Sequence, residues 1–209
     1  MQKNKEARAT ENSAKETALR KALNGLAKGV RVLTVPPLMA AALLLILRAG
    51  KGYFSQGALY WGLFFLTFLP LASYGVWAAI PPLRRRGRDA QRSLAVIFSV
   101  AGYLGVALYG VLAARPVEEQ IVFFTYLISG ALIALFSFVF HIKSSGHACG
   151  VSGPAAMLAY RVSPWFLLGY LLLIPVWQSS LRLKRHTAGE LLLGALFPVE
   201  AMALLIAVM

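Results

Sequence analysis

Long apolar segments run through most of this chain, and they restrict its possible folds more than any other feature. Segments 57–80, 93–114 and 121–142 each match the roughly 20 residues that an α-helix needs to cross the hydrocarbon core of a bilayer. Hydrophobic residues make up 58% of the 209 residues and charged residues only 14%, which is more apolar than a soluble domain of this length. The apolar residues follow one another continuously instead of alternating, unlike those of a transmembrane β-barrel. We therefore expect an all-α integral membrane protein.

The remaining apolar segments complete a polytopic transmembrane bundle of six to seven helices, which we expect to form one domain over residues 32–209. The expected spans are 32–47, 57–80, 93–114, 121–142, 165–179 and 187–209, with a shorter helix over 151–160 whose start lies as early as residue 144. If that short helix failed to cross the membrane, the last loop would change sides.

Residues 1–31 precede the first span, and we interpret them as a polar tail followed by an amphipathic helix. The first 13 residues are polar, and we expect them to be solvated. Leu19, Leu23, Leu26 and Val30 then recur at the spacing of one helix face, whereas the lysines and arginines lie mostly off it. Such a helix is typical of a segment that lies on an anionic membrane surface, and an ordinary solvated helix is the alternative.

Basic residues are concentrated on one side of the expected topology. The chain carries a formal net charge of +13. The tail and the loops 81–92, 143–150 and 181–186 hold 17 of the 21 Lys and Arg residues, and the other side holds four. The positive-inside rule therefore places the basic side in the cytoplasm, which predicts the inner (plasma) membrane of a bacterium or archaeon. Because topology accounts for the charge, and no separate basic and aromatic platform is present, we expect no nucleic-acid partner.

Two polar turns, each with a histidine, lie on this basic side. They are HIKSSGHACG, residues 141–150, and LRLKRHTAGE, residues 181–190. Glu190 follows His186 by four residues, so a helix starting at 187 places the carboxylate one turn from the imidazole. A carboxylate there accepts the ring N–H, fixes the tautomer and leaves the other nitrogen free to attack. Contact with the membrane interface, or a pair with Arg185, is the alternative for Glu190.

The first of these turns has the composition of an anion site. Ser145 and Gly146 stand just before or at a helix start, where backbone N–H groups bind anions and glycine permits a close approach. His147 follows and can protonate a departing oxygen near neutral pH. Further cationic side chains belong to the same region: Lys143, Arg182, Lys184 and Arg185. A nucleophile, an acid and cations around an anion predict phosphoryl chemistry at a membrane surface.

The order of these motifs resembles that of the type-2 phosphatidic acid phosphatase superfamily, the lipid phosphate phosphatases, which share a fold with vanadium haloperoxidases. That family carries K-x6-R-P, P-S-G-H and S-R-x5-H-x3-D. The second motif stands here as SSGH, residues 144–147, without its proline. The third stands as Ser179-Ser180-x5-His186-x3-Glu190. The resemblance covers residues 81–208.

The resemblance implies a metal-independent phosphohydrolase without a cofactor, acting on a lipid phosphate or an isoprenyl (di)phosphate. By analogy His186 attacks phosphorus and becomes phosphohistidine, and His147 protonates the leaving group. Glu190 takes the place of the aspartate that orients the nucleophile. Ser145 and Gly146 bind phosphate oxygens.

The chain departs from the family pattern at two arginines. Ser180 stands where the third motif has arginine, and we expect Arg182 to replace it. Residues two apart face the same way in an extended turn but not in a helix. For the first motif, the dipeptide at 115–116 lacks its lysine and lies on the opposite membrane face, so we expect Arg88 and Arg92 to bind phosphate instead. A purely topological role for the arginines of 81–92 is the alternative.

Other interpretations stay open. His141 is expected to be an interfacial residue, and Cys149, the single cysteine, a small packing residue. A metal site made by these two residues and His147 matches no usual zinc spacing. A non-hydrolytic binder, carrier or flippase for a polyprenyl or lipid phosphate is the alternative function. A phosphotransferase is a third.

Overall fold

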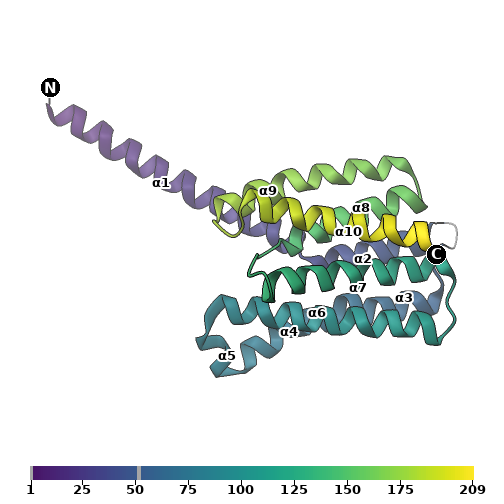
Figure 1. Cartoon of the computed structure of the whole chain (residues 1–209). Coiled ribbons are helices and arrows are strands. Elements are labelled where there is room, and N and C mark those ends of the chain that lie inside the picture. Colours follow the sequence, from purple (N-terminus) through teal and green to yellow (C-terminus); the bar gives the residue numbers. More distant parts are fainter. Residues whose placement is uncertain (1, 51–52) are drawn as a thin grey trace.

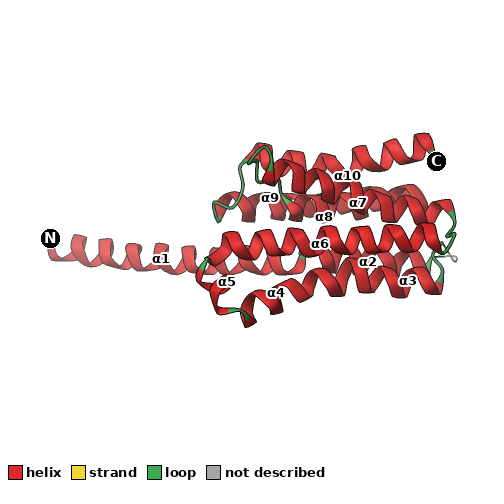
Figure 2. Ribbon diagram, turned by 60° about the horizontal axis from the view of Figure 1, so that its bottom comes forward, coloured by secondary structure: helices red, strands yellow, loops and turns green. Residues whose placement is uncertain are grey.

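The computed structural model describes the backbone of residues 2–50 and 53–209, and side chains from residue 17 onward within those ranges. The described residues form helices and connecting loops without a strand (Figure 2). The elements are α1 (Gln2–Leu33), α2 (Pro36–Ala49), α3 (Gln56–Gly62), π-helical η1 (Leu63–Phe68), α4 (Leu69–Ala79), α5 (Pro81–Arg85), α6 (Gly87–Leu112), α7 (Val117–Phe138), α8 (Gly146–Arg161), 3₁₀-helical η2 (Pro164–Leu172), α9 (Leu173–Arg182) and α10 (Ala188–Val208). The predicted all-α fold is confirmed.

Most of these helices are suited to a bilayer. Within the described residues, five continuous helical segments are long and apolar enough to cross a membrane: Gln56–Ala79, Gly87–Leu112, Val117–Phe138, Pro164–Arg182 and Ala188–Val208. A sixth is added if α1 from Thr17 and α2, which meet at a bend of 49°, count as one span. The chain is thus an integral membrane protein with a polytopic helical bundle, as the sequence predicts.

Helix α8 is shorter than α6, α7 and α10, but it runs from one end of the bundle to the other. Its 16 residues rise about 24 Å. His147, in its first turn, contacts Arg31. Arg161, in its last turn, has its guanidinium 5.5 Å from the ring centre of Tyr53, in the loop after α2. Because α8 crosses the bundle, the loops before α8 and α10 lie at the same end.

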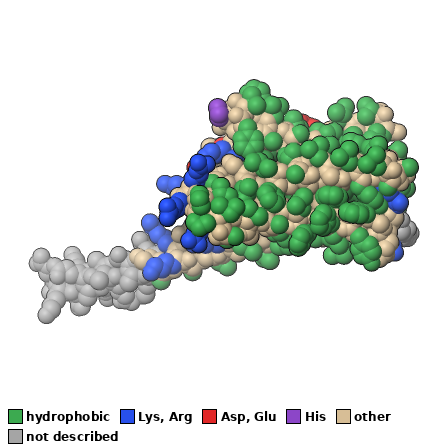
Figure 3. All heavy atoms as spheres, turned by 90° about the horizontal axis from the view of Figure 1, so that it is seen from below, with side chains coloured by type: hydrophobic (Ala, Val, Ile, Leu, Met, Phe, Trp, Pro, Cys, Tyr) green, Lys and Arg blue, Asp and Glu red, His purple; other side chains and the backbone are tan. Residues whose placement is uncertain are grey.

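That shared end is called here the basic end. It holds α5, the junction of α1 with α2, the loop before α8 and the loop between α9 and α10 (Figure 1). Lysine and arginine side chains gather at this end, and hydrophobic side chains cover the flank of the bundle (Figure 3). The other end of the bundle holds the α6–α7 loop and the C-terminus (Figure 1).

Helix α1 projects beyond the basic end of the bundle (Figures 1 and 2). It begins at Gln2, so the helix includes most of the segment expected to be a non-helical tail. Leu19 and Leu26 are 60% and 68% exposed, so the rest of the chain does not cover the apolar face of α1. The N-terminal helix is confirmed, and its position on a membrane surface stays a prediction.

The bend between α1 and α2 follows from two consecutive prolines. Pro36 and Pro37 start α2, where their missing N–H groups cost least. Val35, before them, is extended at φ −63° and ψ 134°, as a residue before proline prefers. The chain therefore changes direction within a few residues of Arg31, the last basic residue of α1.

Glycines on the long helices let neighbouring segments approach closely near the site. A Cβ at Gly130 on α7 would overlap the ring of Tyr103 on α6. A Cβ at Gly194 on α10 would overlap the backbone oxygen of Ser145. The turn before α8 is therefore packed against the first turns of α10, which fixes the two histidine turns relative to each other.

Candidate active site

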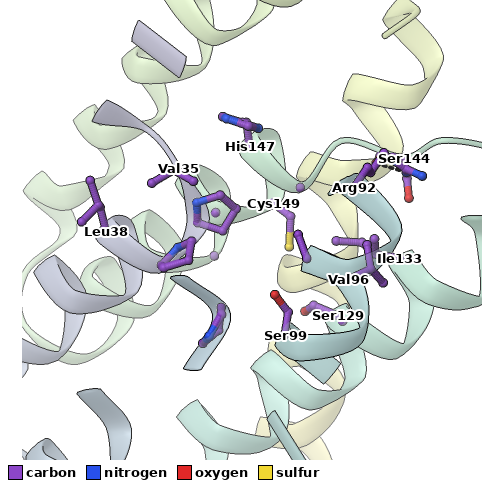
Figure 4. Close-up of a pocket in the computed structure, with 18 of the residues that line it drawn as sticks. Val35, Leu38, Arg92, Val96, Ser99, Ser129, Ile133, Ser144, His147 and Cys149 are labelled. Atoms are coloured by element: carbon purple, nitrogen blue, oxygen red, sulfur yellow. Dashed lines mark hydrogen bonds between the residues drawn. The ribbon is translucent and has the colours of Figure 1, made fainter. Parts of the chain in front are cut away.

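A cavity of about 750 Å³ opens at the basic end, and both predicted catalytic histidines line it. Residues of α1, α2, α4, α6, α7, α8 and α10 enclose it, together with the loops before α8 and α10. In Figure 4, His147, Arg92 and Ser144 lie at one side of the cavity, while Ser99 and Ser129 lie deeper. Its cationic lining consists of Arg31, Arg88, Arg92, Lys143, Lys184 and Arg185.

The cavity changes from polar to apolar along the antiparallel helices α6 and α7. At the mouth, Arg92 Nη2 donates to Ser137 Oγ at 3.0 Å. At the inner end the rings of Tyr103 and Tyr126 stand 5.5 Å apart. On both helices 11 residues separate the two levels, so the inner end lies roughly 16 Å from the mouth. Intervening lining residues are mostly apolar and include Val96, Val100, Ile133 and Met157.

His186 lies in the loop before α10, with one ring nitrogen held by its surroundings. Its Nδ1 is 2.8 Å from the carbonyl oxygen of Lys143. Because a carbonyl oxygen only accepts, Nδ1 carries the proton and Nε2 carries the lone pair. Glu190 Oε2 is 3.4 Å from the same Nδ1, so the carboxylate lies near the imidazole, as its spacing predicts. The ring N–H was expected to bond to this carboxylate, but its acceptor is the Lys143 carbonyl.

The protonation state of His186 suits a nucleophile. Burial lowers its pKa below the ordinary value of 6.5, and the positive charges of Arg31 and Arg92 act in the same direction. The Lys143 carbonyl and the Glu190 carboxylate oppose this change without reversing it. The imidazole is therefore neutral at pH 7, and its Nε2 lone pair is free to attack.

Glu190 joins the two histidine turns. Its Oε2 accepts the backbone N–H of Thr187 at 2.9 Å, and Thr187 Oγ1 accepts the N–H of Glu190, so the pair forms a capping box at the start of α10. Its Oε1 accepts the N–H of Lys143 at 3.3 Å, and its carbonyl oxygen accepts the N–H of Ser145 at 2.9 Å. The carboxylate is thus fixed beside His186.

His147 is bound through both ring nitrogens to a residue that sequence reasoning missed. Its Nδ1 is 3.4 Å from Arg31 Nη2, and its Nε2 is 3.0 Å from the Arg31 carbonyl oxygen. A guanidinium only donates, so Nδ1 accepts and Nε2–H donates. Arg31 Nη1 also donates to Ser180 Oγ at 2.9 Å. No local pattern indicates these contacts, because Arg31 looks like one more basic residue of the amphipathic helix.

The backbone groups expected to bind phosphate are arranged differently from the prediction. Ser145 caps α8: its hydroxyl accepts the N–H of Ala148 at 3.3 Å, and the residue is buried and does not line the cavity. Gly146 does line the cavity. So does Ser144, whose Oγ is buried and has no hydrogen-bond partner among the described residues. Ser144 therefore offers a free hydroxyl to the cavity, whereas Ser145, which was expected to bind phosphate oxygens, does not line it.

Arg182 is not at the cavity. Helix α9 continues through Arg182, so this side chain points away from the side on which Ser180 is buried. Arg182 Nε instead donates to Asn24 Oδ1 on α1 at 3.0 Å, at the surface. The replacement of the motif arginine by Arg182 required an extended turn, which the chain does not form there.

The other predicted cations do line the mouth. Arg92 is half-buried and also lies 3.5 Å from the carbonyl oxygen of Ser144. Arg88 is exposed at the rim. Lys143 Nζ is 3.4 Å from Asp89 Oδ1, also at the rim. The structure therefore brings these three cations together with both histidines.

Three residues weighed for other roles lie as follows. Arg115 is at the opposite end of the bundle, where its Nε is 2.8 Å from Glu119 Oε2. His141 is exposed and does not line the cavity, whereas Cys149 does. Within the described ranges no three His, Cys, Asp or Glu residues are grouped so as to hold a metal ion.

No family model, curated protein or solved structure matches the chain. What the site can do therefore follows from its own chemistry. A ring of cations with a free hydroxyl suits an oxyanion, a neutral imidazole suits attack on an electrophilic centre, and an apolar chamber suits a hydrocarbon tail.

Proposed function

We propose that the chain is a membrane-embedded phosphatase that hydrolyses a lipid phosphate or isoprenyl (di)phosphate through a phosphohistidine at His186. The observation that carries this proposal is the orientation of His186 at the mouth of the cavity. Its Nδ1–H is held by the Lys143 carbonyl beside Glu190, which leaves Nε2 as the attacking atom. The resemblance of the two histidine turns to the lipid phosphate phosphatases supports the same reaction.

The proposed reaction has two steps. In the first, the His186 Nε2 lone pair attacks the terminal phosphorus, and the bond from that phosphorus to the leaving oxygen breaks. The leaving group is the lipid alcohol or, from a diphosphate, the lipid monophosphate. The departing oxygen takes a proton from His147 in its imidazolium form, and a phosphohistidine remains. In the second, water attacks phosphorus, the phosphorus–nitrogen bond breaks, and its electron pair returns to Nε2. The proton from water restores His147, and inorganic phosphate leaves.

The cavity favours a substrate with a single tail. A volume of about 750 Å³ is that of a pocket for one drug-sized molecule. The phosphate would meet the cations of the mouth, and the tail would run along α6 and α7 toward Tyr103 and Tyr126. An isoprenyl diphosphate fits this shape better than a phosphatidate with two acyl chains. By the positive-inside rule we place the mouth in the cytoplasm.

The test is phosphate release by the purified protein in detergent, with EDTA present. Candidate substrates are a series of isoprenyl diphosphates, phosphatidate and phosphatidylglycerol phosphate, with released phosphate measured by malachite green. We expect turnover of an isoprenyl diphosphate, its loss in His186→Ala, and ³²P-labelled protein when a labelled substrate is quenched early. Normal turnover by His186→Ala would remove the mechanism.

His141→Ala is the matched control for that test. It removes the same side chain from the loop before α8, but His141 is exposed and outside the cavity. We expect it to turn over like the wild type. Equal losses in the two variants would mean that replacing any histidine of these loops disturbs the protein.

The second candidate is a non-hydrolytic binder, carrier or flippase for the same phosphates. It is favoured by the contact of both His147 nitrogens with Arg31, which leaves neither nitrogen free in this conformation. Binding or transport of a labelled polyprenyl phosphate without phosphate release would support it. An acceptor-dependent product would instead show a phosphotransferase.

A further inference from the structure

The side chain of Arg31 lies beside Ser180, the residue that replaces the arginine of the third sequence motif. Ser180 stands where the related motif has arginine, and it is fully buried on α9. The guanidinium of Arg31, a residue distant in the sequence, contacts this serine: Arg31 Nη1 donates to Ser180 Oγ at 2.9 Å. The same guanidinium reaches His147 and lines the cavity.

We propose that Arg31 of the N-terminal helix binds the oxygens of the substrate phosphate, and so supplies the guanidinium that position 180 lacks. This inference rests on the proposed function, because it assigns the anion of that same site. It makes α1 a part of the active site as well as a membrane-surface segment.

The present partners of Arg31 are weak acceptors that a phosphate would displace. Ser180 Oγ and His147 Nδ1 are both neutral, and the second distance is long at 3.4 Å. Bonds between a guanidinium and phosphate oxygens are charge-assisted, roughly twice as strong as neutral ones, and often forked. Arg31 is also half-buried, so water solvates its positive charge poorly. A bound anion would compensate that charge, which the present neutral partners do not.

The position of Arg31 lets one guanidinium act on both histidines. It contacts His147 directly, and it lines the same cavity as His186. An anion held by Arg31 would therefore lie within reach of the nucleophile and of the acid. Arg182, the other candidate for this role, is bonded to Asn24 at the surface and does not line the cavity.

Phosphate binding by Arg31 would also prepare His147. While Arg31 Nη2 donates to Nδ1, that nitrogen cannot carry a proton. When the guanidinium turns to the phosphate, Nδ1 is released and the imidazole can take up the proton that it later gives to the leaving oxygen. Burial and the charge of Arg31 lower the pKa of His147 to about 3, so this imidazole is not an acid near neutral pH by itself. It becomes one only with the anion in place, whose negative charge raises the pKa again.

The experiment compares four variants of the full-length protein in detergent. Arg31→Ala removes the guanidinium, and Arg31→Lys keeps a point charge. The double variant Arg31→Ser with Ser180→Arg moves the guanidinium to α9, and Arg20→Ala is an exposed control on α1. Three quantities are measured: orthovanadate affinity by calorimetry, and kcat and KM for an isoprenyl diphosphate by steady-state kinetics.

We expect Arg31→Ala to weaken orthovanadate binding by about 10- to 100-fold, the usual value of a hydrogen bond to a charged group. We expect Arg31→Lys to regain part of the loss, the double variant to regain most of it, and Arg20→Ala to match the wild type. The unfolding temperature of each variant in detergent separates a binding effect from a folding effect.

Each other outcome has a definite meaning. Vanadate affinity in Arg31→Ala equal to that of Arg20→Ala overturns the inference and leaves the phosphatase proposal standing. A loss that neither Arg31→Lys nor the double variant regains shows a structural role and also overturns it. A wild type that binds orthovanadate but releases no phosphate overturns the phosphatase, while the same binding series still decides the role of Arg31. A wild type that does not bind orthovanadate overturns both.

Discussion

The two ends of the bundle contain charged clusters of opposite character. At the basic end, six cations and one carboxylate, Asp89, line the large cavity together with the two histidines. At the opposite end, a smaller cavity of about 320 Å³ is lined by Arg115, Arg161, Glu118 and Glu119, so its charges are balanced. The charges that line the cavity at the opposite end therefore compensate one another, whereas those at the basic end leave an excess of positive charge.

The balanced end needs nothing from outside the chain. Glu119 is 3% exposed, and its carboxylate accepts Arg115 Nε at 2.8 Å and the N–H of Ser55 at 2.7 Å. Arg161 lies over the ring of Tyr53. At the basic end only Arg31 and Arg92 are half-buried, and the other four cations are exposed. Because uncompensated charges that are partly buried are costly, we expect an external anion to bind at the basic end, and we expect the cluster at the opposite end to have a structural role.

The largest effect is expected from replacing His147, the proposed acid at the basic end. His147→Ala should lower kcat for phosphate release by roughly 100- to 10,000-fold, the usual contribution of general acid–base catalysis. Steady-state kinetics in detergent measure it, with His141→Ala as the control. A kcat within a few-fold of the wild type would leave His147 with a structural role only.

A matched pair of variants tests the comparison directly. Arg92→Met at the basic end should weaken orthovanadate binding by about 10-fold, because a cation of the mouth is lost. Arg115→Met at the opposite end should leave that affinity unchanged. It should instead lower the free energy of unfolding by about 1–3 kcal/mol, because buried Glu119 loses its guanidinium partner.

Calorimetry with orthovanadate and chemical denaturation in detergent measure the two quantities. If both variants weakened vanadate binding equally, the charge balance of the two ends would say nothing about function.

The pH dependence of kcat/KM sharpens the role of His186. Its pKa lies below 6.5, and only the neutral imidazole attacks, so activity should be insensitive to this group at pH 7. As pH falls through the lowered pKa, the imidazole gains a proton and kcat/KM should fall by about tenfold per pH unit. A pH–rate profile between mildly acidic and neutral pH measures this. An acidic limb that begins above pH 6.5 would contradict the assignment.

The smallest effect is expected at Arg182. Arg182→Ala removes a surface contact with Asn24, and we expect kcat/KM to change by less than about twofold, as is usual for a surface substitution. The value is obtained in the same assay as for Arg31→Ala. A loss as large as that of Arg31→Ala would mean that Arg182, on α9, replaces the motif arginine after all.

The fold could be predicted from the length and spacing of the apolar segments. The position of the two histidine turns at one end could be predicted from the even number of membrane crossings between them. Apolar segments of membrane length define the helices, and two crossings between the turns bring them to one end. The distance between His186 and Glu190 follows from a spacing of four residues and a helix start that the sequence marks with Thr187. The helical spans and the spacing of His186 and Glu190 are both set by residues close to one another in the sequence.

The details of the anion site could not be predicted, because they depend on distant contacts and on single turns of helix. Arg31 and His147 are 116 residues apart in sequence, and nothing local marks their contact. Arg182 was assigned on the assumption of an extended turn, but α9 remains helical there. Ser145 was assigned as a phosphate ligand, but its hydroxyl caps the helix, and Ser144 beside it keeps a free hydroxyl.

The cavity has its charged groups at one end only, and this gives the proposed reaction a direction. A phosphorylated lipid has to present its headgroup from the leaflet on the basic side, and inorganic phosphate returns to that same compartment. When the substrate is a monophosphate, the product alcohol has lost the charge that held it in one leaflet, so it can cross the bilayer unaided. Hydrolysis would thus convert a lipid confined to one leaflet into one shared by both.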